Sequence, residues 1–332
     1  MERLATTALP EGDPVLVTGS AGFFGLAIVR ALSTAGVPVI ATDRVEPSEF
    51  VVRPGTDGAL IRYVRRDVSA EPLEDLVGEV TGVVHAAALT PADERTADTA
   101  ERLMAVNVGA LPPLLAAMRA SHSCSRLLFI SSSGVYDQSE ARTLAESDAT
   151  GGTTLYGAGK LAGELVARRY SSLFDLEFAA VRPTSLFGGG ELVRPSRPRV
   201  TGFARLVAAA VRREPVRIDR PDARADWLCV DDAADAIALL WRSGCLDGRS
   251  FNLSSGRPCA FRDVVASVVE AAGLRVDDTA TAFVDGGSDR PAVIPNERLR
   301  AATAWEPRRT FADGAADLLE DPRFRSWADG AT

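Results

Sequence analysis

The chain has 332 residues, 46% of them hydrophobic and 25% charged, which is ordinary for a globular protein. Its formal net charge of −8 argues against nucleic acid or an anionic membrane surface as the main partner. The four cysteines (Cys124, Cys229, Cys245 and Cys259) form no CxxC pair, and two histidines are too few for a histidine-built metal site. We find no apolar signal region and no apolar run of 18 residues, and therefore expect a cytoplasmic protein without a membrane span.

The first half of the chain alternates short β-rich runs with longer Ala/Leu-rich stretches. A helix is predicted over 22–35, and strands are predicted at 14–19, 37–43, 61–67, 82–88, 125–133 and 176–183. Continuous apolar strands separated by helices indicate a parallel sheet that is covered on both faces. Pro112-Pro113 interrupts one helical stretch and predicts a kink or a fresh helix start, because two backbone donors are lost there.

The segment 188–199, rich in glycine, proline and arginine, is the clearest break in this alternation. Beyond it the pattern predicts a strand at 250–254 and helices at 201–213, 231–243, 261–272 and 311–319. We therefore predict an α/β fold: a Rossmann-type doubly wound parallel sheet with a smaller C-terminal substrate-binding lobe. The expected division is a cofactor-binding domain over 1–185 and the lobe mainly over 186–332, with 226–256 packing back onto the sheet.

The stretch TGSAGFFG places Gly19, Gly22 and Gly25 between the first strand and the first helix. Glycine at these points permits a tight turn, lets backbone amides approach a pyrophosphate and allows close packing of helix on strand. The helix N-terminus then offers unpaired N–H groups to the phosphates. A glycine triplet alone also serves tight turns that bind nothing, so a second feature is needed.

That second feature is Asp43, which closes the second predicted strand. A carboxylate at this position can accept hydrogen bonds from both hydroxyls of an adenosine ribose, and it repels a 2′-phosphate. The adjacent Arg44 could stack on adenine or pair with a 2′-phosphate. Asp43 favours NAD over NADP as the cofactor, and Arg44 leaves NADP as the alternative.

Tyr156 and Lys160, in the stretch YGAGK, lie one turn apart on a predicted helix. Lys160 is the one lysine among 37 basic residues. An ammonium beside a phenol favours the phenolate, which turns a poor base into a usable one. A compact ammonium can also reach ribose hydroxyls that a bulkier guanidinium reaches less well. The alternative is a surface lysine that an arginine-biased chain has kept by chance.

Together these features resemble the extended short-chain dehydrogenases/reductases, the family of nucleotide-sugar epimerases and dehydratases. The matching motifs are TGSAGFFG, Asp43, RRD ending at Asp67, HAAA at 85–88, VN at 106–107, SSSGVY at 131–136, YGAGK, and RADWLCVDDAADA at 224–236. The resemblance implies that Tyr156 is the catalytic base and acid, that Lys160 binds the ribose, and that Ser132 bonds the reacting oxygen. The residues that it assigns to the cofactor are Gly19, Gly22, Phe23, Gly25, Asp43, Arg44, Asp67, Val68, Ala86, Ala87, Tyr156 and Lys160.

The candidate substrate contacts are Thr90, Ser133, Thr184, Ser185, Arg224 and Arg290. The resemblance implies that the two arginines bind the diphosphate of a nucleotide sugar, a task that suits the guanidinium fork. Solvated or ion-paired arginines are the alternative, and Ser133 is as well explained by a local backbone hydrogen bond. We expect Asn107 to join helix and strand backbone and His85 to be a satisfied core histidine.

The reaction is less well defined by the sequence. Similar dehydratases and decarboxylases carry an acid at one of the two residues after the position of Ser132, where this chain has Ser133 and Gly134. Epimerisation through a transient ketone is therefore favoured. Thr184 and Ser185 stand where such epimerases carry asparagine, which leaves the sugar contact open. A net dehydrogenase or ketoreductase on a sugar, uronate or natural product is the alternative, and a non-catalytic NAD(P)-sensing regulator is a third hypothesis. The resemblance also implies a homodimer through helices over 98–119 and 155–172.

Overall fold

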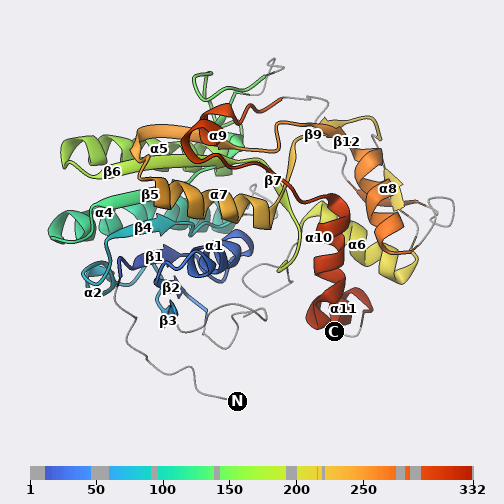
Figure 1. Ribbon diagram of the computed structural model, residues 1–332, viewed down its shortest axis with the longest axis horizontal. Coiled ribbons are helices and arrows are strands. Elements are labelled where there is room, and N and C mark those ends of the chain that lie inside the picture. Colours follow the sequence, from blue (N-terminus) through green and yellow to red (C-terminus); the bar gives the residue numbers. More distant parts are fainter. Residues whose placement is uncertain are drawn as a thin grey trace.

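The computed structural model describes residues 12–45, 60–90, 96–137, 143–191, 200–214, 216–218, 221–273, 281–284 and 293–330. Within these ranges the larger part of the protein is built on one seven-stranded sheet in the order β11-β6-β5-β4-β1-β2-β3, with every pair parallel (Figure 1). The strands are β1 (Val15–Thr18), β2 (Val39–Asp43), β3 (Ile61–Arg65), β4 (Gly82–His85), β5 (Arg126–Ile130), β6 (Glu177–Pro183) and β11 (Asp247–Leu253). The predicted doubly wound parallel sheet is confirmed.

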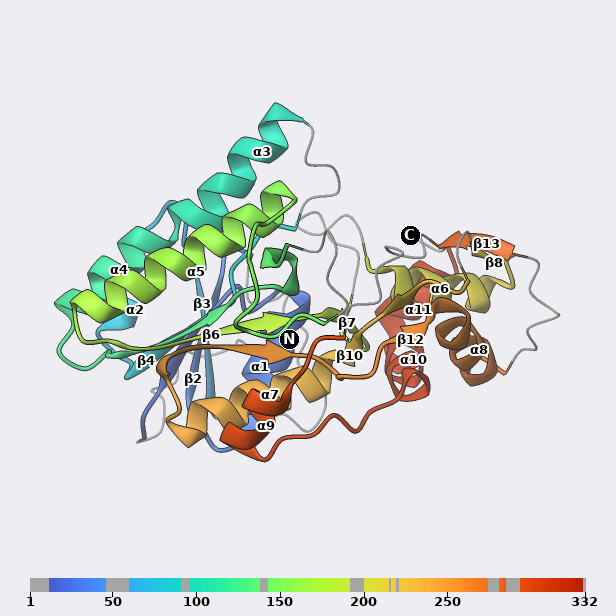
Figure 2. The same ribbon diagram turned by 90° about the horizontal axis from the view of Figure 1, so that it is seen from above.

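Helices cover both faces of this sheet (Figure 2). One face carries α1 (Phe23–Thr34), α7 (Val230–Ser243) and α9 (Glu297–Thr303); the other carries α2 (Glu74–Val77), α3 (Ala97–Met104), α4 (Leu111–Ala120) and α5 (Leu155–Leu173). Successive strand residues point to opposite faces, so Val15 and Val17 join the core that contains Ile237, while Leu16 joins the core that contains Leu114. Both faces need apolar residues, which explains the continuous apolar strands.

The two consecutive prolines begin a helix instead of breaking one. A π-helical turn, η3 (Ala105–Gly109), ends the helical run that starts with α3, and α4 then begins at Leu111 with Pro112 and Pro113 in its first turn. First-turn amides have no partner within a helix, so proline costs little there. The predicted fresh helix start is confirmed, and the single helix predicted over 98–119 is in fact divided.

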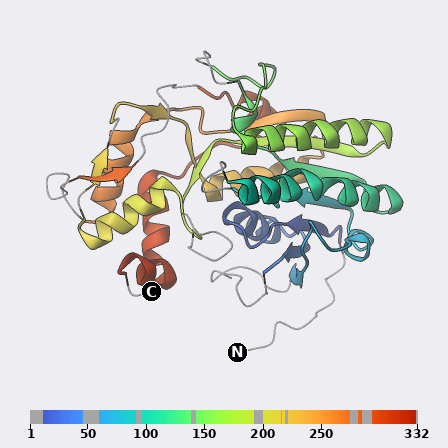
Figure 3. The same cartoon turned by 180° about the vertical axis from the view of Figure 1, so that it is seen from behind.

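One helical stretch in the described part of the chain, Asp98–Ala120, is long and apolar enough to cross a membrane by length and composition alone. Of its most apolar window, 44% is buried inside the protein, and core helices pass the same test. The stretch packs beside α5 on the sheet, as Figure 3 shows from behind. It is therefore weak evidence for a membrane span.

A smaller lobe lies beyond one end of the sheet (Figures 1 and 2). Its helices α6 (Gly202–Arg212), α8 (Phe261–Ala271), α10 (Phe311–Glu320) and α11 (Pro322–Ala328) share an apolar core that includes Phe203, Val264 and Phe324. Short strand pairs complete it: β7 (Ser185–Phe187) with β10 (Trp227–Cys229), β9 (Arg224–Ala225) with β12 (Cys259–Ala260), and β8 (Val216–Ile218) with β13 (Thr281–Val284). Between β10 and β12 in the sequence, the chain returns to the seven-stranded sheet. There α7 packs on α1, and β11 pairs with β6.

Because all seven strands run in the same direction, their carboxyl ends meet at one edge of the sheet. The chain order also reverses at β1, whose neighbours are β2 and β4. In open α/β sheets, ligands bind outside the carboxyl ends of the strands at such a switch point. The topology therefore directs attention to the residues that follow β1, β4 and β5.

Candidate active site

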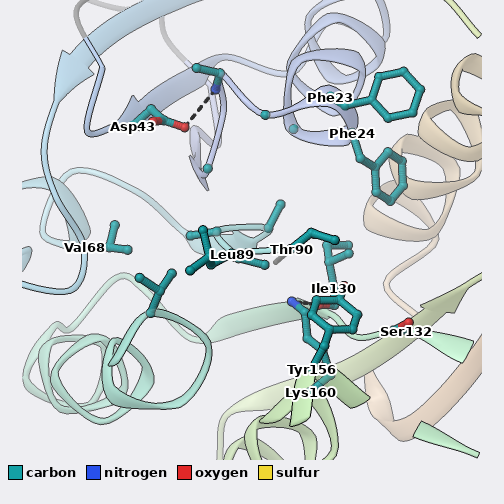
Figure 4. Close-up of a pocket in the computed structure, with 18 of the residues that line it drawn as sticks. Phe23, Phe24, Asp43, Val68, Leu89, Thr90, Ile130, Ser132, Tyr156 and Lys160 are labelled. Atoms are coloured by element: carbon teal, nitrogen blue, oxygen red, sulfur yellow. Dashed lines mark hydrogen bonds between the residues drawn. The ribbon is translucent and has the colours of Figure 1, made fainter. Parts of the chain in front are cut away.

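A cavity of about 730 Å³ lies at this edge of the sheet. Figure 4 shows Asp43 and Phe23 across the cavity from Tyr156 and Lys160. Most of the residues singled out by the sequence line it: Gly19, Gly22, Phe23, Gly25, Asp43, Arg44, Asp67, Val68, Ala86, Ala87, Thr90, Ser132, Tyr156, Lys160 and Thr184. The fold thus brings together groups from the ends of β1, β2, β3, β4, β5 and β6 and from the first turn and a half of α5.

Three predicted substrate residues, Ser133, Ser185 and Arg224, are not among the cavity-lining residues. Ser133 begins a short 3₁₀ turn and Ser185 is exposed on β7. Arg224 is exposed on β9, where its guanidinium donates to the Pro258 carbonyl oxygen at 2.5 Å. Arg290 lies outside the described residues.

The glycine loop approaches the end of β4 so closely that a side chain has no room. Gly19 has a φ of +69°, and a Cβ atom there would lie 2.5 Å from the Ala87 Cα atom. Gly22 is the N-cap of the following helix α1 and supplies no side-chain cap to its first amides. This cradle suits phosphate groups, which accept from such amides.

Asp43 braces the loop as well as lining the cavity. Its carboxylate accepts from the Ala21 amide at 3.1 Å and from the Val45 amide at 3.3 Å. Burial raises the pKa of Asp43, although these hydrogen bonds and Arg44 act in the opposite direction. The carboxylate therefore fixes the spacing between the end of β2 and the glycine loop.

Asp67 provides a second acidic group at the same end of the cavity. It accepts from the Ser69 amide at 2.9 Å and from the Ser69 hydroxyl at 2.6 Å. Partial burial would raise the pKa of Asp67, but the bonds from Ser69 and the charges of Arg44 and Arg65 lower it below its ordinary value. Asp67 is thus an ionised acceptor at the end of the cavity that Arg44 also lines.

The opposite wall is the start of α5. Thr154 caps this helix by accepting from the Gly157 amide at 3.0 Å, which fixes the turn that carries Tyr156. Ser132 accepts from the Gly134 amide at 3.0 Å, so its own hydroxyl proton remains to donate toward the cavity. A phenol, an ammonium and a hydroxyl donor therefore meet at one end of the cavity.

Lys160 is almost completely buried, with 2% of its surface exposed. Its Nζ donates to the Ile130 carbonyl oxygen at 2.8 Å and lies 5.3 Å from the centroid of the Phe129 ring. Burial lowers the pKa of Lys160 to about 7. New acceptors in the cavity, such as ribose hydroxyls, would favour the ammonium again.

His85 and Asn107 have structural roles, as expected. His85 is buried, pairs through Nδ1 with the Thr18 hydroxyl at 2.9 Å and stacks on Phe129. Burial, with a smaller effect of the Lys160 charge, lowers the pKa of His85 to about 3, so the ring is neutral. Asn107 accepts from the Leu89 amide at 2.7 Å and donates to the Leu89 carbonyl at 3.0 Å, which holds the chain after β4.

Sequence reasoning missed part of the cavity wall. The additional lining residues include Arg66, Leu89, Arg102, Leu186, Gly190, Val200 and Thr201. Thr201 is the N-cap of α6 and bonds to the buried Glu191. A threonine before an apolar helix signals such a cap, but the sequence has no feature that places it at the cavity.

Comparison with known proteins agrees with this geometry. Residues 15–254 match the family described as the NAD dependent epimerase/dehydratase family. The chain belongs to this family. Its cofactor is NAD, and the predicted family, enzyme class and cofactor are confirmed.

Two curated relatives of the enzyme differ in their reactions. It is 28% identical over 318 residues to the UDP-glucose 4-epimerase of Azospirillum brasilense, which covers 90% of this chain and 89% of the relative. It is 27% identical over 323 residues to the dTDP-glucose 4,6-dehydratase of Streptomyces griseus, with 94% and 95% covered. Among solved structures, MoeE5 in complex with UDP-glucuronic acid and NAD is similar with a TM-score of 0.74 and 27% identity, covering 92% of this chain and 97% of that one.

Lys160 should make the stability of the cofactor-free enzyme depend on pH in a predictable way. The folded pKa of about 7 lies below the ordinary value of 10.5, so between these values the unfolded chain binds a proton that the folded protein does not. The free energy of unfolding therefore rises with pH between about 7 and 10.5. Below pH 7 the folded protein bears the full cost of burying the charge. We expect Lys160→Met to be more stable than the wild type at pH 7, by on the order of 3 kcal/mol.

Urea denaturation between pH 7 and pH 10 measures this difference. The difference in stability between Lys160→Met and the wild type should shrink as the pH approaches 10. Lys160→Arg is the matched control, because a guanidinium keeps its charge throughout this range. The free energy of unfolding of the wild type should rise with pH relative to both variants, and with the same slope. A constant difference would contradict the assignment.

Proposed function

We propose that the enzyme epimerises a nucleotide sugar through a transient keto intermediate. The observation that carries this proposal is the meeting of Tyr156, Lys160 and Ser132 at one end of a cavity whose other end has the form of a dinucleotide site. A UDP-glucose 4-epimerase among the relatives, and the UDP-glucuronic acid and NAD bound to MoeE5, support it. The larger part of the protein, which is built on the seven-stranded sheet, would hold the cofactor. The smaller lobe, mainly over 186–332, would hold the substrate.

The proposed cofactor contacts follow from the residues that line the cavity. The glycine loop and the start of α1 would receive the pyrophosphate, and Asp43 the adenosine ribose. Asp67 would accept from the adenine amino group, and the small side chains after β4 would pack on the cofactor. The set proposed for the cofactor is Gly19, Gly22, Phe23, Gly25, Asp43, Arg44, Asp67, Val68, Ala86, Ala87, Tyr156 and Lys160.

The chemistry follows from the three groups at the other end. NAD supplies the acceptor, and later the donor, of a hydride. Tyr156 removes the proton of a sugar hydroxyl as a base and returns it as an acid. Ser132 donates to the same oxygen as it becomes a carbonyl. The Lys160 ammonium would bond to the nicotinamide ribose and would favour the phenolate.

Epimerisation is favoured over dehydration by the position of the acids. Among the described residues that line the cavity, the carboxylates are Asp43 and Asp67, both at the end formed by β2 and β3. Beside Ser132 the chain has Gly134 without a side chain, and Ser133 does not line the cavity. A dehydratase needs an acid near the sugar to protonate the leaving hydroxyl.

A second candidate is a net dehydrogenase or ketoreductase on a sugar, uronate or natural-product substrate. It is favoured by the uncharged side chains of Thr90, Thr184, Leu186 and Thr201 in the cavity wall, which would not pair with a diphosphate. The orientation of Arg224 toward Pro258, away from the cavity, points the same way. A regulator that only senses NAD(P) would need neither Tyr156 nor Lys160.

We also propose that the enzyme is a cytoplasmic homodimer. Helix α5 exposes Leu165, Val166 and Leu173, and its C-cap residue Phe174 is exposed beside them. This apolar set suits a four-helix interface with a second copy. Light scattering at micromolar concentration would give twice the chain mass, and a monomer would refute the dimer.

Cofactor choice tests the proposed role of Asp43. We expect NAD to bind at least about tenfold more tightly than NADP, because the carboxylate repels a 2′-phosphate. Asp43→Asn keeps an oxygen for the Ala21 amide but loses the charge, so it should reduce the preference for NAD over NADP. Calorimetry measures both affinities, and equal or tighter binding of NADP by the wild type would show that Arg44 dominates.

Tyr156→Phe tests the reaction itself. The variant should lose about 10²–10⁴ in rate while still binding NAD, because the ring is retained and the proton acceptor is not. Chromatography of a panel of nucleotide sugars follows their interconversion, and absorbance follows NADH. Accumulation of NADH in step with product would promote the dehydrogenase alternative, and full turnover by the variant would remove Tyr156 from the mechanism.

A further inference from the structure

A buried ion pair lies beneath the candidate active site without lining the cavity. The side chains of Glu164 on α5 and Arg182 on β6 are 1% and 5% exposed. Arg182 donates to the carboxylate twice, from Nη2 at 2.6 Å and from Nε at 3.1 Å. Such a pair is costly to bury and contributes little net stability, so its presence calls for a further role.

The pair contacts both ends of the turn that carries Ser132. On one side, the hydroxyl of Ser131 donates to Glu164 Oε2 at 3.0 Å. On the other side, the guanidinium carbon of Arg182 lies 4.8 Å from the ring centroid of Tyr136, which is fully buried. The turn between them is therefore held from both ends by one pair of charges.

Helix α5 makes the corresponding contacts from its own side. Lys160 bonds to Ile130, the residue before Ser131. In the first turn, Gly157 lies so close to the Ser132 turn that a Cβ atom would be 2.3 Å from the Gly134 carbonyl oxygen. Helix α5, which carries Tyr156, therefore contacts the segment around Ser132 from three of its residues: Gly157, Lys160 and Glu164.

An ionised carboxylate is suited to this position, because several donors converge on it. Besides Arg182 and Ser131, Glu164 accepts from Arg168 at 3.0 Å and from Ser250 at 2.6 Å. Burial alone would raise the pKa of Glu164, but the hydrogen bonds and charge of Arg182, with the two serines, hold it below its ordinary value. A carboxylate offers about four lone-pair sites, whereas an amide would turn two of its own donors toward Arg182.

We propose that Glu164, with Arg182 as its counter-charge, is a positioning residue that fixes the Ser132 turn against α5, so that Ser132 and Tyr156 reach the same substrate oxygen. The catalytic part of this inference rests on the proposed function. Its structural part, that Glu164 orders the turn through Ser131, does not.

Two serines that donate to the same carboxylate provide a matched test. Ser131 leads directly into Ser132 and itself lines the cavity, whereas Ser250 lies on β11 and does not line it. Ser131→Ala and Ser250→Ala each remove one donor to Glu164. Ser250→Ala also removes the acceptor of a hydrogen bond from Arg168 at 2.5 Å, so its melting temperature should fall at least as far. We expect kcat to fall about tenfold in Ser131→Ala and less than twofold in Ser250→Ala, because small displacements of reacting groups are costly.

Two further measurements separate disorder of the turn from damage to the base or to the cofactor site. The NAD affinity and the pH midpoint of kcat should stay unchanged in Ser131→Ala, since the base and the cofactor contacts are intact. Hydrogen–deuterium exchange of the segment 131–137 should be faster in Ser131→Ala than in Ser250→Ala, because the Gly134 amide bonded to Ser132 loses protection.

Equal exchange in the two variants would overturn the proposal whatever the reaction proves to be. Equal kcat losses would also overturn it, because Ser131 would then act only through general stability. Weaker NAD binding in Ser131→Ala would assign Ser131 to the cofactor instead. If the wild type turned over no nucleotide sugar, the proposed function would fail, and the exchange data would still decide whether Glu164 orders the turn.

Discussion

The hydrogen bond from Lys160 Nζ to the Ile130 carbonyl is the contact on which the site depends. It joins α5 to the end of β5 in an environment from which water is almost excluded. A lysine can lessen its burial penalty by releasing a proton, and its pKa is lowered to about 7, whereas an arginine stays charged and is bulkier. This difference gives a physical reason why a chain with 37 basic residues has its one lysine here.

Charge is distributed along the cavity in a way that separates two tasks. Asp43 and Asp67 stand at the end where the glycine loop and the start of α1 offer backbone amides. The other described end has hydroxyl and apolar groups around Tyr156 and Lys160. Glu164 and Arg182, the charges that we propose to hold this second end, do not line the cavity. Binding and reaction therefore draw on different electrostatic features of one fold.

The sheet and most helices could be predicted from the sequence, because strands buried on both faces leave continuous apolar runs. The predicted strand 125–133 was too long, since β5 ends at Ile130 and Ser131 bonds to Glu164. The short strands of the smaller lobe, such as β9 and β12, were missed because two-residue pairs leave no periodicity. Arg224 shows a further limit: neighbouring residues of a strand point to opposite sides, so a motif that resembles a family does not decide which residue faces the cavity.

The contacts that organise the site were beyond sequence reasoning for a different reason. Glu164 and Arg182 are 18 residues apart on a helix and a strand, and nothing in their local sequence distinguishes them from solvated charges. Of the two serines that donate to Glu164, Ser131 follows β5 and Ser250 lies on β11. Such a network is defined only when the order β11-β6-β5 is known.

The most direct test of the account is the fate of the sugar hydrogens. If Tyr156 and bound NAD oxidise and then reduce the same carbon, the hydride that leaves the sugar returns to it. A nucleotide hexose deuterated at every ring carbon, converted in ordinary water and examined by mass spectrometry, should give an epimer that keeps all of its deuterium. Loss of one deuterium per turnover would contradict a transient oxidation within a closed site.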